Sequence, residues 1–210
     1  MQCPLCFSKL HTHIQAVHDR DLYKCSVCKL VFSPPDFLLE KEDEKERYLE
    51  HENSIEQPGY VKFLSQAIGE ALPYLKTGDE GLDFGSGPGP TLHFLLKQKG
   101  FLCDNYDPLF NPHIPQKKYD YIFATECFEH FHNPYKEMVF ITELLKKGGI
   151  VTIMTELYDV ETDFASWYYV TDPTHVCFYH IDTFDFICNT FGYERLKSHN
   201  KRVIMLRKRK

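Results

Sequence analysis

The sequence contains no long apolar run and no recognisable export signal. No stretch approaches the ~18 consecutive apolar residues that a membrane-spanning helix needs. The first residues, Met1 to Pro4, lack the charged and then apolar pattern of a secretory leader. We therefore expect a cytoplasmic protein without a membrane partner.

A surplus of basic residues is also missing. The formal net charge is −6, and 43% of the residues are hydrophobic, as in ordinary globular chains. Proteins that bind nucleic acid usually carry a basic face. We interpret the short basic end, Arg207 to Lys210, as a solubilising tail. RNA is thus not favoured as a partner, although the sequence leaves it open, and the oligomeric state is not readable.

The sequence contains eight cysteines, and four of them lie near the N-terminus. Without an export signal, reduced thiols or metal ligands are favoured over disulfides. The N-terminal four form two C-x2-C pairs, which are Cys3 with Cys6 and Cys25 with Cys28. This spacing predicts a closed, structural zinc site of four thiolates, with the intervening segment as a small hairpin.

Two alternatives for the cysteine pairs stay open at this point. The pairs could be reduced thiols or disulfides without metal. One of three histidines between the pairs, His11, His13 or His18, could also replace a thiolate, but four cysteines already close the site.

The remainder of the chain alternates between short apolar runs and helical patterns, which predicts βα units and a mainly parallel sheet. A segment rich in Glu, Asp and Lys, residues 40–56, is expected to be a solvated helix. Expected strands are 80–84, 102–106, 119–124, 150–155, 193–198 and 202–206, the last two as an antiparallel hairpin. Expected helices are 59–76, ending near Pro73, then 90–99, 134–145 and 181–191.

A glycine-rich turn, Gly85-Ser86-Gly87-Pro88-Gly89, follows the strand expected at 80–84 and precedes a helix. Glycines there allow positive φ angles and a close approach to a ligand. Asp83, just before the turn, would repel a pyrophosphate but suits a cationic amino-acid group. Asp107 ends the next strand, where a carboxylate can accept hydrogen bonds from two ribose hydroxyls.

Together these segments resemble the class I S-adenosylmethionine-dependent methyltransferases. The resemblance covers roughly residues 46–210 and is carried by an ordered set of segments: Leu82 to Gly89, Tyr106-Asp107-Pro108, Tyr119 to Glu126, Glu129-His130-Phe131, and Leu145 to Gly149 before a strand. It implies an α/β, Rossmann-like fold with a C-terminal antiparallel hairpin. We therefore expect a zinc-ribbon-like module at 1–38, an acidic helical linker or lid at 39–58 and the methyltransferase domain at 59–210.

The resemblance also implies roles for individual residues. Gly85, Ser86, Gly87 and Gly89 would wrap the methionine and ribose parts of the cofactor. Asp83 would lie near the amino group, Asp107 would hold the ribose, and Thr125 and Glu126 would form the pocket floor. The run from Tyr48 to Asn53, with Gly59-Tyr60, resembles the family's lid, although a plain linker fits nearly as well. Only a short segment separates Asp107 from Tyr119, so the family's third strand must be short or absent.

Methyl transfer from a sulfonium is an in-line displacement that depends mainly on alignment, and a base is needed only if the acceptor loses a proton. The candidates for that base are His130, which follows the strand expected at 119–124, and His175, which lies in an aromatic loop where Asp172 could orient it. A structural hydrogen bond is the alternative role for each. Cys127 and Cys177 are expected to be packed thiols.

The acceptor is not readable, and a small or sugar-like molecule is favoured. Asn-Pro-Pro-Tyr, typical of amino methylation of DNA bases, is missing after the fourth strand. One alternative is an RNA methyltransferase that grips its substrate through the zinc module. Another is a non-catalytic module that binds cofactor or a partner. A nicotinamide oxidoreductase is disfavoured because the third glycine of its fingerprint is missing.

Overall fold

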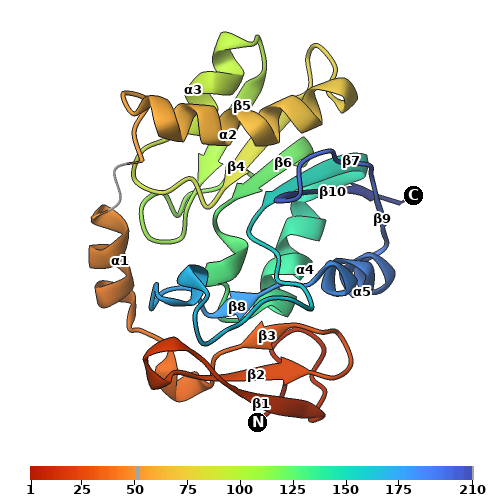
Figure 1. The fold of residues 1–210 in the computed structure, drawn as a ribbon. Coiled ribbons are helices and arrows are strands. Elements are labelled where there is room, and N and C mark those ends of the chain that lie inside the picture. The colour runs from red at the N-terminus through yellow and green to blue at the C-terminus, as the bar shows by residue number, and fades with distance from the viewer. Residues whose placement is uncertain (51–52, 210) are drawn as a thin grey trace.

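The computed structural model describes residues 1–50 and 53–209, and its main feature is a twisted sheet of six strands in the order β5-β4-β6-β7-β10-β9 (Figure 1). The strands are β4 (Glu80–Phe84), β5 (Leu102–Tyr106), β6 (Tyr119–Thr125), β7 (Leu145–Met154), β9 (Tyr193–Arg195) and β10 (Val203–Lys208). The first four are parallel, and β10 runs antiparallel to both β7 and β9. The Rossmann-like α/β fold with an antiparallel end is confirmed.

The strand predictions differ from the structure mainly at two ends. The strand expected at 150–155 begins at Leu145, because Leu145 already pairs with Tyr119 across an irregularity in the ladder. The strand expected at 193–198 ends at Arg195. Between β5 and β6 the described chain adds no strand to the main sheet, and only an isolated bridge joins Asp107 to Asn111.

Two pairs of helices cover the two faces of the main sheet. Figure 1 shows α2 (Pro58–Ala71) and α3 (Thr91–Gln98) on one face and α4 (Pro134–Leu144) and α5 (Ile181–Phe191) on the other. Strand β6 feeds both layers: Tyr121 and Phe123 join the α2–α3 core, while Ile122 and Ala124 join the α4–α5 core. A strand buried on both faces needs such a continuous apolar run.

Local sequence explains where several helices begin and end. Pro58 and Pro134 occupy the first turns of α2 and α4, where a missing N–H costs nothing. Helix α2 ends at Ala71, just before the Leu72–Tyr74 turn that contains Pro73. Gly192, at φ 77°, closes α5 in the left-handed conformation that favours glycine.

The N-terminal residues form a second, antiparallel sheet that the larger domain completes. Its strands are β1 (His11–Gln15), β2 (Asp21–Cys25), β3 (Val31–Phe32) and β8 (Cys177–Phe178), in the order β1-β2-β3-β8. The pair β1–β2 is the hairpin expected between the cysteine pairs. The partner of β3 comes from far along the chain, so the N-terminal module and the larger domain share a sheet.

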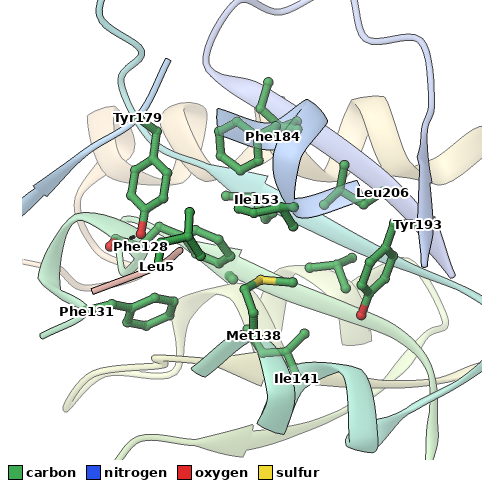
Figure 2. Close-up of a cluster of buried hydrophobic side chains, with 14 of the residues drawn as sticks. Leu5, Phe128, Phe131, Met138, Ile141, Ile153, Tyr179, Phe184, Tyr193 and Leu206 are labelled. Carbon is green, nitrogen blue, oxygen red and sulfur yellow. Dashed lines mark hydrogen bonds between the residues drawn. The ribbon is translucent and has the colours of Figure 1, made fainter. Parts of the chain in front are cut away.

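The two parts also share a hydrophobic core. Leu5 of the module is fully buried, and Figure 2 shows it beside Phe128 and Tyr179. The Tyr179 hydroxyl donates to the Phe128 carbonyl at 3.0 Å, so this polar group is satisfied inside the cluster. The module is therefore packed into the larger domain.

Helix α1 (Lys41–Leu49) occupies only part of the acidic segment expected to be helical over 40–56. Gln57 has extended backbone angles because the residue before a proline disfavours the helical region. The expected lid residues His51 and Glu52, and Lys210 of the basic tail, lie outside the described residues. Among the helices within residues 1–50 and 53–209, none has the length and apolar character to cross a membrane.

Candidate functional site

A cavity of about 1070 Å³ opens where β4, β5 and β6 end at their carboxyl termini. This edge is where open α/β sheets bind ligands, because loops after successive strands converge there. Its lining includes these residues predicted from the sequence: Gly85, Ser86, Gly87, Asp107, Thr125, Glu126, His130 and His175. The cavity is slightly larger than typical ligand pockets, which have volumes of roughly 300–1000 Å³.

The glycine turn after β4 forms one wall of the cavity. Gly85 and Gly87 have φ angles of 80° and 63°, which side chains rarely adopt. A Cβ on Gly85 would lie 2.7 Å from the Cβ of Cys127, so glycine is required there sterically as well. The N–H groups of Gly85 and Ser86 both donate to the carbonyl of Tyr106, which joins this turn to β5.

Asp107 organises the neighbouring wall. One carboxylate oxygen accepts from the N–H of Gly87 at 2.9 Å, and the other accepts from Leu109 at 2.8 Å and Phe110 at 3.0 Å. A carboxylate has about four acceptor positions, so one remains for a ligand hydroxyl. Asp107 therefore fixes the glycine turn while facing the cavity.

Two predicted cofactor residues lie behind the lining. Asp83 is 3% exposed and its Oδ1 has no hydrogen-bond partner. Burial, followed by the charge of Asp107, raises the pKa of Asp83 to about 7. Gly89 is covered by the chain at Asn53, whose carbonyl would lie 3.0 Å from a Cβ on that glycine.

Thr125 ends β6 at the cavity, and Glu126, the next residue, is strained. Its φ of 51° is uncommon for a residue with a side chain. Its Oε1 is buried without a hydrogen-bond partner. Burial, and then the charge of Glu129, raises the pKa of Glu126 to about 9. Such stored strain and an unsatisfied polar group are typical of functional sites.

Helix α1 contributes Glu44, Arg47 and Tyr48 to the lining of the cavity. Arg47 of α1 pairs with Asp172 at 2.9 Å, and Glu44 pairs with His132 at 2.8 Å. The Tyr48 ring packs edge-on against His130, with centroids 5.1 Å apart. The segment predicted as a lid or a plain linker therefore contacts the loops that line the cavity.

The two predicted base residues meet, and Glu129 joins them. The rings of His130 and His175 are 4.8 Å apart at their centroids. One ligand atom from each of Glu129, His130 and His175 lies within 4.8 Å of the other two. Burial lowers the pKa of His175, although the charge of Glu129 raises it. His175 Nδ1 contacts the Tyr169 carbonyl at 2.7 Å, whereas Asp172 accepts from Thr174 and Arg47.

Sequence reasoning missed two residues that build this cluster. Glu129 is 1% exposed and accepts from the hydroxyls of Tyr169 at 2.7 Å and Thr155 at 2.9 Å. Its position next to His130 was the available signal. Arg20 gave no signal, because its partners are carbonyl groups far along the chain.

Arg20 connects the N-terminal module to the His175 loop. Its guanidinium donates to the carbonyls of Val170 at 2.9 Å and Asp172 at 3.1 Å, and also to the carbonyl of His175. It also donates to the hydroxyl of Ser33 at 2.8 Å. The module thus holds the loop that carries one side of the cavity.

The four N-terminal cysteines converge. The Sγ atoms of Cys3 and Cys28 are 3.5 Å apart, and those of Cys6 and Cys25 are 3.4 Å apart. All four ligand atoms lie within 4.8 Å of one another. Tetrahedral zinc with Zn–S bonds of ~2.3 Å needs S···S separations of roughly 3.8 Å. The geometry therefore fits a four-thiolate ion site.

The two cysteine turns repeat the same backbone pattern. The N–H of Phe7 donates to the Cys3 carbonyl, and the N–H of Lys29 donates to the Cys25 carbonyl. Phe7 and Lys29 also share positive φ angles of 60° and 63°. Of the alternative histidine ligands, His13 instead pairs with Asp21 at 2.6 Å. Cys127 and Cys177 are buried thiols, as predicted.

Comparison with known proteins identifies the larger domain. The sequence model of a family described as "Methyltransferase domain" matches residues 55–198. Among solved structures, a Haemonchus contortus phosphoethanolamine N-methyltransferase bound to phosphomonomethylethanolamine and S-adenosylhomocysteine is 18% identical, with a TM-score of 0.52 over 63% of this chain and 38% of that one. The YcgJ protein of Bacillus subtilis is 12% identical, with a TM-score of 0.50 over 70% of this chain and 98% of that one. No curated protein sequence matches this chain.

Proposed function

This chain belongs to the class I S-adenosylmethionine-dependent methyltransferases, and we propose that it methylates a small, sugar-like acceptor bound beside Glu129, His130 and His175. One observation carries the proposal: a single cavity is lined both by the glycine turn and by the Glu129–His130–His175 cluster. Its volume of about 1070 Å³ has room for a cofactor and a small acceptor together.

The residues around the glycine turn fit the cofactor. S-adenosylmethionine supplies a methyl carbon on a positively charged sulfur. We assign Gly85, Ser86, Gly87 and Gly89 to its methionine and ribose parts, because the turn lets backbone approach closely. The unpartnered Oδ1 of Asp83 suits the ammonium group, reached through water because Asp83 lies behind the lining. Asp107 offers its remaining acceptor position to the ribose, and Thr125 and Glu126 form the floor.

His130 and His175 are assigned to the acceptor. A neutral imidazole within the cavity can take a proton from an acceptor hydroxyl as methyl transfer proceeds. Burial keeps His175 neutral by lowering its pKa. A small acceptor is favoured over RNA because acidic residues contribute to the lining and the chain carries a net charge of −6.

Calorimetric titration with S-adenosylmethionine tests the cofactor assignment. Native protein is expected to bind with a Kd in the micromolar range. Asp107→Asn should bind at least ~10-fold more weakly, because it loses a charged acceptor for the ribose. Asp104→Asn, on β5 just before Asp107 but outside the lining, is the matched control and should bind as the native protein does. A folded, cofactor-free native protein that gives neither heat nor a thermal shift would refute the assignment.

Zinc is proposed for the four-cysteine site as a structural ion. Thiolates arranged with this spacing favour zinc, and a module of this size gains folding free energy from metal. None of the eight cysteines forms a disulfide in the described chain, so the four at the N-terminus are available as ligands. Metal analysis should find one zinc fewer per chain in Cys25→Ser than in the native protein. Cys188→Ser, on α5, is the control and should retain zinc.

A further inference from the structure

The Glu129–His130–His175 cluster has the donor set of a metal site. It offers one carboxylate and two imidazoles, and ligand atoms from the three lie within 4.8 Å of one another. Metal–ligand bonds of ~2.1 Å place neighbouring ligands roughly 3 Å apart, which small side-chain rotations can reach from this arrangement. The cluster lines the cavity, so an ion held there would be accessible to an acceptor.

Hydrogen bonds to backbone carbonyls fix both imidazoles in one tautomer. His130 Nδ1 lies 3.0 Å from the carbonyl oxygen of Thr174, and His175 Nδ1 lies 2.7 Å from that of Tyr169. A carbonyl oxygen only accepts, so each Nδ1 must carry the proton. In each neutral ring the lone pair is therefore on Nε2. This is the usual outer support of metal-binding histidines.

Glu129 is oriented in the same way. Its two carboxylate oxygens accept from the hydroxyls of Tyr169 and Thr155, and the residue is almost fully buried. Those bonds leave acceptor positions on both oxygens, because a carboxylate has about four. All three side chains are thus held by neighbours that preserve their capacity to coordinate.

We propose that Glu129, His130 and His175 bind a divalent first-row cation that holds a vicinal diol of the acceptor. This deepens the proposed function and rests on it for the identity of the reaction, with His130 and His175 coordinating the cation instead of acting as the general base. Two imidazole nitrogens with one carboxylate suit manganese, iron, cobalt or zinc better than the all-oxygen preference of magnesium or calcium. Three protein ligands on an octahedral ion leave positions for two adjacent oxygens.

A general base would require only one of these side chains. Coordination of a cation uses all three together. The cation would lower the pKa of the acceptor hydroxyl, which then loses its proton to solvent. The hydroxyl oxygen forms the new bond to the methyl carbon, the carbon–sulfur bond breaks, and its electron pair stays on sulfur. The products are a methyl ether, S-adenosylhomocysteine and one proton.

Manganese binding tests the site directly. Full-length protein carrying one equivalent of zinc is titrated with Mn²⁺, and the free Mn²⁺ signal is followed by electron paramagnetic resonance. About one Mn²⁺ per chain should bind. Glu129→Gln and His175→Asn should each weaken binding at least ~10-fold, since each removes a ligand. His132→Asn is the matched control: its side chain lines the same cavity outside the cluster, and Mn²⁺ binding should be unchanged.

Several outcomes would overturn the proposal. If native protein does not reduce the free Mn²⁺ signal, the proposal is refuted whatever the variants show. It is also refuted if Glu129→Gln and His175→Asn bind Mn²⁺ as tightly as the native protein does. Catechol should change the bound Mn²⁺ spectrum and phenol should not, and no change with catechol would refute the diol. Calorimetry with S-adenosylmethionine on the same samples establishes that each variant is folded. Cofactor binding without Mn²⁺ binding would refute this inference and leave the proposed function standing.

Discussion

Arg20 is a buried cation whose partners are mostly backbone carbonyls. It is 3% exposed, and its bonds to Val170, Asp172 and His175 fix the loop that carries part of the cavity wall. Burial lowers the pKa of Arg20 to about 10, so the guanidinium remains charged at neutral pH. Lysine cannot reproduce this planar fork of donors.

Arg20→Lys is therefore expected to lower the free energy of unfolding by ~2–4 kcal/mol, because buried carbonyls lose their charged donor. Urea unfolding at pH 7 measures the loss. The single tryptophan, Trp167, lies in the same loop, so its emission should shift in the folded variant. Arg195→Lys, which changes an exposed ion pair with Asp185, is the control and should cost under ~0.5 kcal/mol. An equal loss of unfolding free energy in the two variants would contradict the role of Arg20 in holding the His175 loop.

Asp83 should make stability depend on pH. Its pKa rises from 3.8 to about 7 in the folded protein, through burial and then Asp107. Between those pH values the folded state holds a proton on Asp83 that the unfolded state releases. The contribution of Asp83 to the free energy of unfolding is therefore fully present below about pH 4 and is lost as the pH rises to about 7. A shift of roughly three pKa units corresponds to up to ~4 kcal/mol.

Asp83→Asn removes this titration. Its melting temperature relative to native protein should rise from pH 4.5 to about pH 7 and level off by pH 8, as measured by scanning calorimetry. Asp104→Asn, half-exposed on the neighbouring strand, should show no such rise. A difference in melting temperature between the native protein and Asp83→Asn that stays constant with pH would show that Asp83 titrates normally.

Residues in local motifs were the readable part of the site. Gly85, Gly87 and Asp107 were predicted from their positions after strand ends and Glu126 from the family resemblance, and all four line the cavity. The contribution of Arg20 could not be predicted, because it depends on carbonyls whose location is decided only by the tertiary fold.

At the scale of elements, the turn after β4 is constrained both by its backbone angles and by its contact with Cys127. Gly85→Ala should lower the free energy of unfolding by ~2–4 kcal/mol, from the left-handed φ of 80° and the 2.7 Å approach to Cys127. Gly100→Ala, at φ 83° with open space around it, isolates the backbone term and should cost ~1 kcal/mol. Urea unfolding compares them, and equal losses would remove the steric argument.

Element prediction succeeded where the pattern was local and long. The bounds of β4, β5 and α5 match the sequence prediction, because apolar runs and caps define them. Helix α1 stopped short of its predicted end, since charge-rich composition does not mark a terminus. Strands β3 and β8 have only two residues each, too few to show an alternation of apolar and polar residues. They pair with each other, so neither could be predicted from its local sequence.

At the scale of the whole molecule, the sequence predicted three parts but not how they pack. The spacing of the cysteines predicted the N-terminal module, and composition predicted the linker. Neither pattern contains the β3–β8 pairing or the burial of Leu5 beside Phe128. Such contacts join segments more than a hundred residues apart, so they depend on surface complementarity between already folded parts.

This packing predicts that the chain unfolds as one cooperative unit. Removing residues 1–38 would expose the edge of β8, including the fully buried Phe178, and would leave the His175 loop without Arg20. Full-length protein should show one calorimetric transition with matching van't Hoff and calorimetric enthalpies. The 39–210 fragment should aggregate or melt well below it. Two transitions, with a fragment that keeps the melting temperature of the larger domain, would instead identify the module as an independent domain, and its contacts with the His175 loop would then contribute little to holding the cavity.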